Sequence, residues 1–557
     1  MTEALSPFQT LPWNIVNAII KHSVTEEYQI ELVLRKLSKQ KNPYNELLGI
    51  CRIWRQLVLE RVWKKYILNI STEYNSVFVN NPQWREGCVP PHNQVALVRD
   101  VEIQASLSGI LTGAASSLLT KSEVSSVVLP CAHRLVLNIQ HDMADFEVEQ
   151  SDATANALRF IQLLGSLAPA INQVRVSLAD SIRVRSQDEQ AISMFLSSLY
   201  GVSQHSTLHL SKSGFATAHF LDSITELSSL SLCWGDNTLL HSKLMHKSSK
   251  TLQKLSISYA HLNAVTTLFS NEQGRGVVYP NMQFLTLADR CGLIPPDLPC
   301  TKHVAPFPNL ISLKLDMLYP FGDDVLFRGN SATLQFMEVT PDPVFLTTLS
   351  DYKVFDEGKY KKLRHLCLTE MINEYIDTTA PAPLMTTFLN NLAGSVQTMD
   401  LEITVEAKDL IAMVAADRQG FRDLQILKAH STHMSLFDIL CLLKGLPSLV
   451  RLDCGVADMG SELDHVAPED LPDYVVSNYS DIGKHFQSWR ADFGRGSNYS
   501  RVTVYAMLLG MVCPKFTRVE SPYINVSSYC EDISNALRSS AFHKYALRLG
   551  KLLELAA

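Results

Sequence analysis

The residues best suited to hold a metal ion are two cysteines and a histidine in the middle of the chain. Cys291, Cys300 and His303 follow one another with the spacing C-x8-C-x2-H. Structural zinc sites pair their ligands over shorter gaps, and the GLIPPDLP segment between the cysteines is typical of a proline-rich loop. The acidic run at residues 140–152 lacks the glycine and the regular oxygen ligands of a calcium loop. The sequence therefore predicts no metal site.

Catalytic motifs are equally absent from the sequence. It contains no G-x-x-x-x-G-K-[ST] phosphate loop, no H-E-x-x-H zinc motif and no G-x-S-x-G nucleophile turn. A histidine and a cysteine in HMSLFDILCLL lie among apolar residues, which is typical of a core helix rather than of a nucleophile and its base. We expect no cofactor and no enzyme activity, so the function is expected to be binding.

The overall charge limits the class of partner. The chain has 557 residues, a formal net charge of −7, 46% hydrophobic residues and 19% charged residues, a balance typical of folded globular proteins. An acidic chain has no general electrostatic attraction for nucleic acid. We therefore expect a protein partner and no nucleic acid.

Several features favour the cytoplasm or the nucleus. The start, MTEALSPFQTLPWN, lacks the cationic and apolar regions of a secretory signal. Apolar runs such as VTVYAMLLGMVC are shorter than the roughly 20 residues that cross a bilayer. Eleven cysteines are scattered without a C-x-x-C pair, which fits reduced thiols. We expect no membrane association.

One short pattern, apolar-x-x-apolar-x-apolar, recurs along the chain, and successive copies are 24 to 33 residues apart. That interval fits one strand, one helix and two turns. Weaker copies lie at LVRDVEIQ, HRLVLNI, INQVRVSL and STLHLS, and later at HFQSWRADF and KFTRVES. The central apolar residues of the nine clear copies are Leu230, Leu255, Leu285, Leu313, Met337, Leu366, Met399, Leu427 and Leu452.

The recurrence predicts a solenoid. Each unit has an apolar strand and an apolar helix face that it cannot bury alone, and stacking of units buries both in one continuous core. Residues 434–445, MSLFDILCLLKG, have the apolar face expected of a connecting helix that ends at Gly445. The alternative is a set of unrelated parallel strands in ordinary α/β domains. The predicted fold class is α/β, with parallel strands on the concave side and helices outside.

These repeats resemble the leucine-rich-repeat family. The resemblance covers roughly residues 95–525, although the asparagine that normally follows the strand is absent, so the repeats are degenerate, as in the large fungal sets of such proteins. We expect the solenoid over residues 95–529 and a capping helix over residues 530–557, which alternates apolar and polar residues at helical spacing.

In such a solenoid, the residues that alternate with the buried ones on each strand line the concave face. Cations and carboxylates are balanced at these positions, which favours a protein substrate over a nucleic-acid strand. The residues predicted to bind the substrate are Lys314, Asp316, Glu338, His365, Asp400, Lys428, Arg451 and Asp453.

The pattern of the first seventy residues predicts a separate helical unit, and we expect a linker to follow it at residues 71–94. LPWNIVNAII opens a helix with a proline in its first turn. Residues 25–40 have apolar residues at helical spacing. Residues 47–68, LLGICRIWRQLVLERVWKKYIL, predict a third helix with an apolar stripe and five cations.

The motifs LP-x-x-I-x-x-x-I and L-x-x-C-R-x-W-R, in this order, resemble an F-box, with a gap between the two halves that is about ten residues longer than usual. The resemblance implies that this surface docks a Skp-family adaptor and, through it, a cullin–RING ubiquitin ligase, while the repeats hold the substrate. The alternative is that these helices only cap the solenoid. The residues implied to bind the adaptor are Leu11, Pro12, Ile15, Ile19, Ile20, Leu48, Cys51, Trp54 and Leu57.

Overall fold

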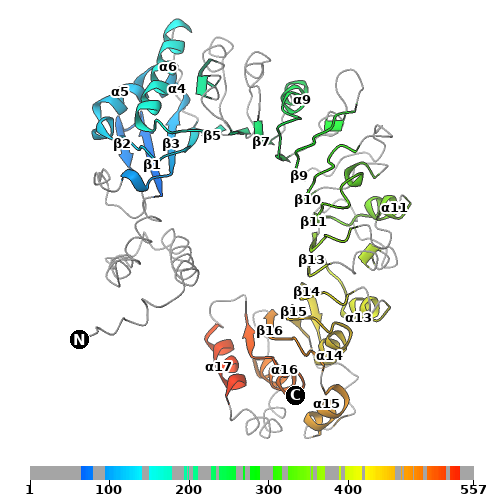
Figure 1. Ribbon diagram of the computed structural model, residues 1–557. Coiled ribbons are helices and arrows are strands. Elements are labelled where there is room, and N and C mark those ends of the chain that lie inside the picture. Colours follow the sequence, from blue (N-terminus) through cyan, green and yellow to red (C-terminus); the bar gives the residue numbers. More distant parts are fainter. Residues whose placement is uncertain are drawn as a thin grey trace, which may run out of the picture. The chain divides into compact units, whose positions relative to one another are not determined.

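A computed structural model of the chain (Figure 1) divides it into two compact units, Met1–Leu244 and Met245–Ala557. Apart from a few single positions, it describes residues 64–79, 95–140, 150–178, 205–210, 227–233, 238–258, 276–288, 305–316, 324–351, 360–369, 396–416, 421–457, 470–480, 482–492, 499–521 and 527–539. No helix among the described residues is both long and apolar enough to cross a bilayer.

The first unit is a mainly parallel sheet. Its strands are β1 (Lys65–Ser71), β2 (Ser76–Val79), β3 (Asp100–Ser106), β4 (Arg134–Gln140), β5 (Gln173–Leu178), β6 (His205–Leu210) and β7 (Leu227–Cys233). Strand β2 pairs with β1 in antiparallel fashion, and from β1 and β3 onward each strand pairs in parallel with the next. Helices α4 (Leu107–Leu111), α5 (Ala114–Lys121) and α6 (Gln150–Leu167) pack against one another.

The second unit is a longer parallel ladder. Its strands are β8 (Lys254–Ser258), β9 (Phe284–Ala288), β10 (Ser312–Asp316), β11 (Phe336–Val339), β12 (His365–Thr369), β13 (Thr398–Glu402), β14 (Ile426–Met434), β15 (Arg451–Val456), β16 (Ser488–Asp492) and β17 (Arg518–Glu520). Each strand pairs with the next one along the chain. The α/β class and the parallel sheet predicted from the repeated pattern are confirmed.

Helices connect the strands of the second unit. They are α11 (Pro343–Asp351), α13 (Ala407–Ala416), α14 (Leu436–Gly445), α15 (Leu471–Tyr479), α16 (Tyr499–Val512) and α17 (Ser527–Arg538), while α9 (Thr238–Lys247) contains the division between the units. Figure 1 shows α11 and α13 on the side of this unit away from its strands. Helix α14 ends at Gly445, as predicted, and begins with a capping box between Ser435 and Asp438.

The core consists of rows of side chains from successive strands. From β8 to β16 the second and fourth residues of each strand point inward, and the central row from Leu255 to Val519 is at most 3% exposed. A third buried row comes from the turn before each strand and includes Leu252, Leu363 and Phe516. These rows are the three apolar positions of the repeated pattern, so the pattern identified the core correctly.

The boundary of the N-terminal unit differs from the prediction. Residues 65–68, predicted as the last part of a helix, belong instead to strand β1 (Lys65–Ser71), which pairs with β3. Tyr66, Leu68 and Ile70 are buried, because this short segment alternates with the two-residue period of a strand. The segment predicted as a linker contains β2. The capping helix was predicted over residues 530–557, and the part described is α17, which packs against β17.

Candidate functional site

The candidate binding face is formed by the alternate side chains of the second unit that do not point into the core. Because the strands pair in register, the third residue of each strand lies beside the third residue of the next. We call this set the middle row. From β9 to β17 it consists of Thr286, Lys314, Glu338, Cys367, Asp400, Lys428, Asp453, Arg490 and Glu520.

The residues predicted to bind a substrate lie on this face. The side chains of Lys314, Asp316, Glu338, Asp400, Lys428 and Arg451 are half-buried, and that of His365 is exposed. Asp453 differs, because its side chain is 0% exposed. A partner at this point would therefore meet the neighbouring Arg451 rather than the Asp453 carboxylate.

Two ion pairs join neighbouring strands in the middle row. Lys314 on β10 pairs with Glu338 on β11, and the Lys428 ammonium on β14 lies 2.6 Å from an Asp400 carboxylate oxygen on β13. Burial lowers the pKa of Lys314, but its hydrogen bond with Glu338 and the nearby carboxylates outweigh burial and raise it. Since both lysines remain partly exposed, each pair stabilises the fold by about 0.2–1 kcal/mol, and its main effect is to hold the charges in place.

A larger ionic network spans the last three strands. Arg451 on β15 donates from Nε and Nη2 to both carboxylate oxygens of Asp453, at 2.7 and 3.1 Å. The same guanidinium reaches Glu520 on β17 at 3.3 Å, and Glu520 also pairs with Arg518 at 2.5 Å. Ser488 lies between Arg451 and Arg518 in the ladder, and its small side chain leaves room for this reach across β16.

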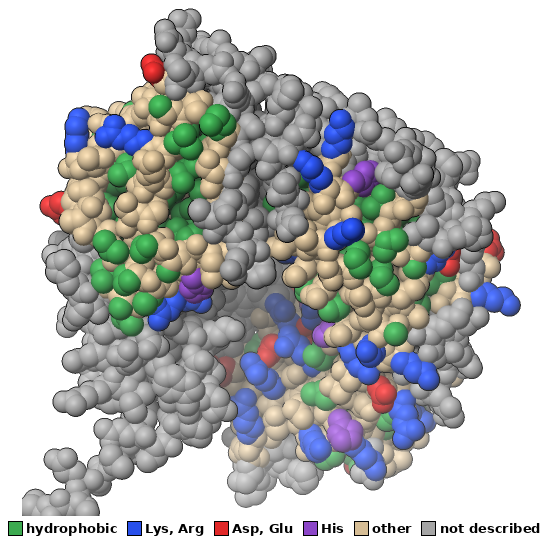
Figure 2. Space-filling model, turned by 45° about the horizontal axis from the view of Figure 1, so that its top comes forward, with side chains coloured by type: hydrophobic (Ala, Val, Ile, Leu, Met, Phe, Trp, Pro, Cys, Tyr) green, Lys and Arg blue, Asp and Glu red, His purple; other side chains and the backbone are tan. Residues whose placement is uncertain are grey.

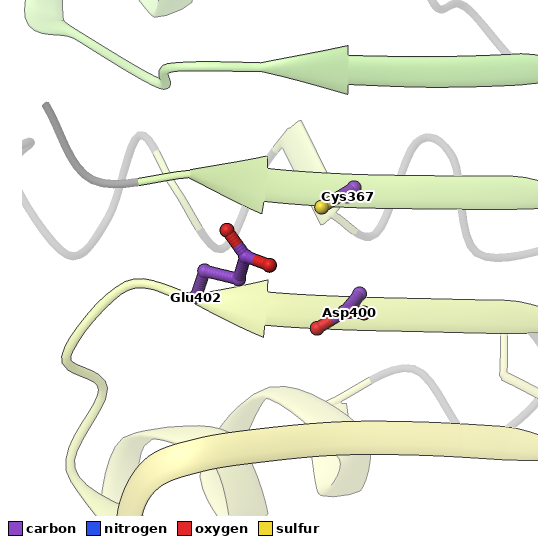
Figure 3. A group of neighbouring side chains, drawn as sticks. All are labelled: Cys367, Asp400 and Glu402. Atoms are coloured by element: carbon purple, nitrogen blue, oxygen red, sulfur yellow. The ribbon is translucent and has the colours of Figure 1, made fainter. Parts of the chain in front are cut away.

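Two residues of the middle row, Cys367 and Asp400, form with Glu402 a group of three side chains able to ligate a cation. The ligand atoms of Cys367 on β12 and of Asp400 and Glu402 on β13 all lie within 4.8 Å of one another. Figure 3 shows the Glu402 carboxylate between the two strands that carry Cys367 and Asp400. One Asp400 oxygen, Oδ1, is buried and has no hydrogen-bond partner among the described residues.

The surroundings of the Cys367 thiol disfavour its ionisation to a nucleophilic thiolate. Burial, followed by the negative charges of Asp400, Glu402 and Glu338, raises its pKa to about 12. Near neutral pH the group therefore holds a protonated thiol beside two carboxylates, whereas a reactive cysteine needs a lowered pKa. The chemistry open to this arrangement is the binding of a cationic group.

The turns that precede the strands form a second surface, which the sequence analysis did not predict. The backbone carbonyl just before each strand accepts hydrogen bonds from two successive amides of the next repeat. We call the turns joined in this way the amino edge. In the second unit, glutamine occupies this position six times, at Gln253, Gln283, Gln335, Gln397, Gln425 and Gln487. The recurring pattern apolar-Q-x-apolar in the sequence is the signal that could have identified this edge.

The residues implied to bind a Skp-family adaptor, from Leu11 to Leu57, lie outside the described residues. The two cysteines and the histidine considered first, Cys291, Cys300 and His303, also lie outside them. Among the described residues, Cys131, Cys367, Cys441, Cys454, Cys513 and Cys530 form no disulfide.

Comparison with known proteins adds little to this geometry. No family model matches the chain, and no curated protein matches it. Among solved structures, a crystal structure of a TLR13–ssRNA13 complex is similar, with 13% sequence identity and a TM-score of 0.36. The similarity covers 83% of this chain and 65% of that one. At this level of similarity, neither residue roles nor a ligand can be transferred to this chain.

Proposed function

We propose that the chain is a leucine-rich-repeat receptor without catalytic activity of its own, and that it binds a protein partner on the face carrying the middle row. The observation that supports this most directly is the ladder from β8 to β17, whose outward side holds polar side chains in fixed register. Repeat arrays present extended binding surfaces of this kind.

The charges of this face favour a protein over a polyanion. Lys314, Lys428 and Arg490 lie in the same row as four carboxylates, and the two lysines are paired with neighbouring carboxylates. A nucleic-acid track needs a strongly positive surface. A protein surface with both signs of charge matches a row that presents both signs, because its accessible charges can meet their opposites.

The N-terminal residues give this receptor its proposed place in a larger assembly. The F-box resemblance supports docking of a Skp-family adaptor through the segments around Ile15 and Trp54, and through it a cullin–RING ubiquitin ligase. The chain would then be the substrate-recognition subunit in the cytoplasm or nucleus, and partner subunits would catalyse ubiquitin transfer. The alternative function is a scaffold protein in which the N-terminal helices only cap the repeats.

Co-expression with a Skp-family adaptor tests the proposal. We expect a stable complex with the wild-type chain, and its loss on substitution Ile15→Asp or Trp54→Ala, because each change removes an apolar anchor worth about 1.5–3 kcal/mol. Lys64→Ala, at an exposed residue, is the matched control and should bind as the wild type does. Circular dichroism of each variant reports whether the repeats remain folded.

Two results would count against the adaptor. One is a wild-type chain that does not co-purify with it, and the other is unchanged binding by both variants. The scaffold alternative predicts the first result together with a lower melting temperature of the Ile15→Asp variant, because a cap protects the repeat beside it.

A further inference from the structure

The amino edge of the second unit brings together residues far apart in the sequence. Gln335 O accepts hydrogen bonds from the amides of Arg364 and His365, and Arg364 O accepts from Gln397 and Thr398. The same connection continues to Gln487 O, which accepts from the amides of the next repeat at 3.1 and 3.2 Å. The turn residues before each strand must therefore lie side by side along this edge.

The amino edge from β12 to β17 is basic. Its turns carry Lys361, Lys362, Arg422, Lys484 and Lys515, all exposed, and none of them has an ion pair with another described residue. Among the described turn residues of these repeats, the acidic side chain is Asp423. Figure 2 shows a face of the molecule on which Lys and Arg side chains gather, with few acidic ones among them.

The opposite edge of the same ladder has the opposite sign. The described carboxylates at or just after the carboxyl ends of its strands include those of Asp316, Glu402, Glu406, Asp409, Asp492 and Glu520. The described cation there is Lys408, which pairs with Glu406. The described residues of the second unit therefore carry opposite charges at its two edges, although the chain as a whole is acidic.

Helix stability explains only part of this separation. Helix α14 has Asp438 in its first turn and Lys444 in its last, as the helix dipole favours. That effect falls off within the terminal turn, whereas Lys361, Lys362 and Lys484 lie in the turns that lead into the strands. Their charges contribute little to folding, so binding is the better explanation for this surface.

We propose that the amino edge from β12 to β17 binds an extended acidic segment of a partner protein. Five strand spacings of about 4.8 Å give an edge of about 24 Å, which an extended peptide of about seven residues would span. The cations lie in the turns before β12, β14, β16 and β17, and alternate residues of such a peptide are about 6.6 Å apart, so carboxylates along one side of it can reach several of these turns. This surface uses other residues than the middle row and does not depend on adaptor binding.

A single-stranded nucleic acid fits this edge less well. Proteins that bind it combine cations with exposed aromatic rings on which bases stack. The buried aromatic residues of these turns are Tyr360, Phe421, Phe486 and Phe516, and they are at most 6% exposed. Exposed glutamines such as Gln425 and Gln487 add amide donors, which suit carboxylates and backbone carbonyls of a peptide.

Fluorescence anisotropy on the full chain tests this proposal. The probe is a labelled peptide of about ten residues in which Glu alternates with Ser, with a Gln–Ser peptide and a single-stranded RNA of equal charge for comparison. The test variant combines Lys362→Gln, Lys484→Gln and Lys515→Gln. The control combines Lys64→Gln, Lys121→Gln and Lys408→Gln, which removes the same charge from exposed lysines elsewhere.

We expect salt-sensitive binding of the acidic peptide and none of the neutral one. The test variant should bind about 3- to 150-fold more weakly, since three exposed ion pairs are lost, and the control variant should bind as the wild type does. Tighter binding of the RNA than of the acidic peptide would overturn the assignment to a protein partner. Absence of acidic-peptide binding, or equal losses in both variants, would overturn the proposal itself.

Discussion

Substitution of Asp453 by alanine is the sharpest test of the ionic network on the last three strands. The change removes the two Asp453 oxygens that accept from the Arg451 guanidinium, and each hydrogen bond to a charged group contributes about 1.5–3 kcal/mol. Removing one partner of a fully buried pair costs about 3–5 kcal/mol. The Arg451 side chain is 31% exposed and keeps Glu520 at 3.3 Å, so we expect a smaller loss of about 2–3 kcal/mol.

The assay must report the stability of individual repeats, because repeat arrays need not unfold in one step. Urea unfolding gives the total change in the free energy of unfolding, and amide hydrogen exchange locates it. We expect faster exchange in β14, β15 and β16 and unchanged exchange in β8 and β9. Asp423→Ala, at an exposed residue, is the control and should change stability by less than about 0.5 kcal/mol.

A double substitution separates the loss of the ion pair from the cost of leaving Arg451 without its Asp453 partner. Arg451→Leu with Asp453→Leu leaves no unpaired charge between these strands, so it should be more stable than Asp453→Ala alone. The reasoning fails if Asp453→Ala costs no more than Asp423→Ala. It also fails if the slowest-exchanging amides of β15 keep their protection.

Three further substitutions test the core, a thiol and a turn. Leu366→Ala should lower the free energy of unfolding in urea by about 2–5 kcal/mol, because Leu366 is 1% exposed and its loss leaves a cavity. Burial raises the pKa of Cys454 to about 12 from an ordinary value of 9.0. Between pH 9 and about pH 12 the thiol is therefore ionised in the unfolded chain but still protonated in the folded one. The free energy of unfolding should fall in this range by about 1.4 kcal/mol per pH unit. A Cys454→Ala chain that loses stability as steeply in this range would contradict that explanation. Gly483→Ala should cost about 1–3 kcal/mol in thermal unfolding, because φ is +55° and the added Cβ would lie 2.9 Å from Cys513 Sγ, whereas Gly165→Ala, with open space around it, should be neutral or stabilising.

The repeated pattern predicted the core and the parallel strands because strand alternation is a local property. Buried Leu313 and Met337 are both central residues of the pattern, and they lie side by side in the structure. The register follows from the same alignment, since the residue after each of them is Lys314 and Glu338, which form an ion pair. The cross-strand pairs of the middle row could therefore have been predicted from the sequence.

Features that depend on neighbours from other repeats could not be predicted from the local sequence. Asp453 occupies an outward position, and it is buried because Arg451 folds over it and reaches Glu520. Strand β1 was predicted as the end of a helix, because the apolar spacing of the preceding residues continues into Tyr66 without a turn signal. The basic amino edge was missed because its cations are scattered over more than 150 residues of sequence and come together only when the repeats stack.

The paired hydrogen bonds of the amino edge also explain how repeats of unequal length fit one ladder. The carbonyl before each strand uses its oxygen for two amides of the following repeat, at 2.7–3.2 Å throughout the second unit. The distance between repeats is therefore set at this edge, whatever the length of the chain that returns to it. We therefore expect insertions and deletions in the connecting segments to leave the strand register intact, because the amino edge and the strands keep the repeats in alignment.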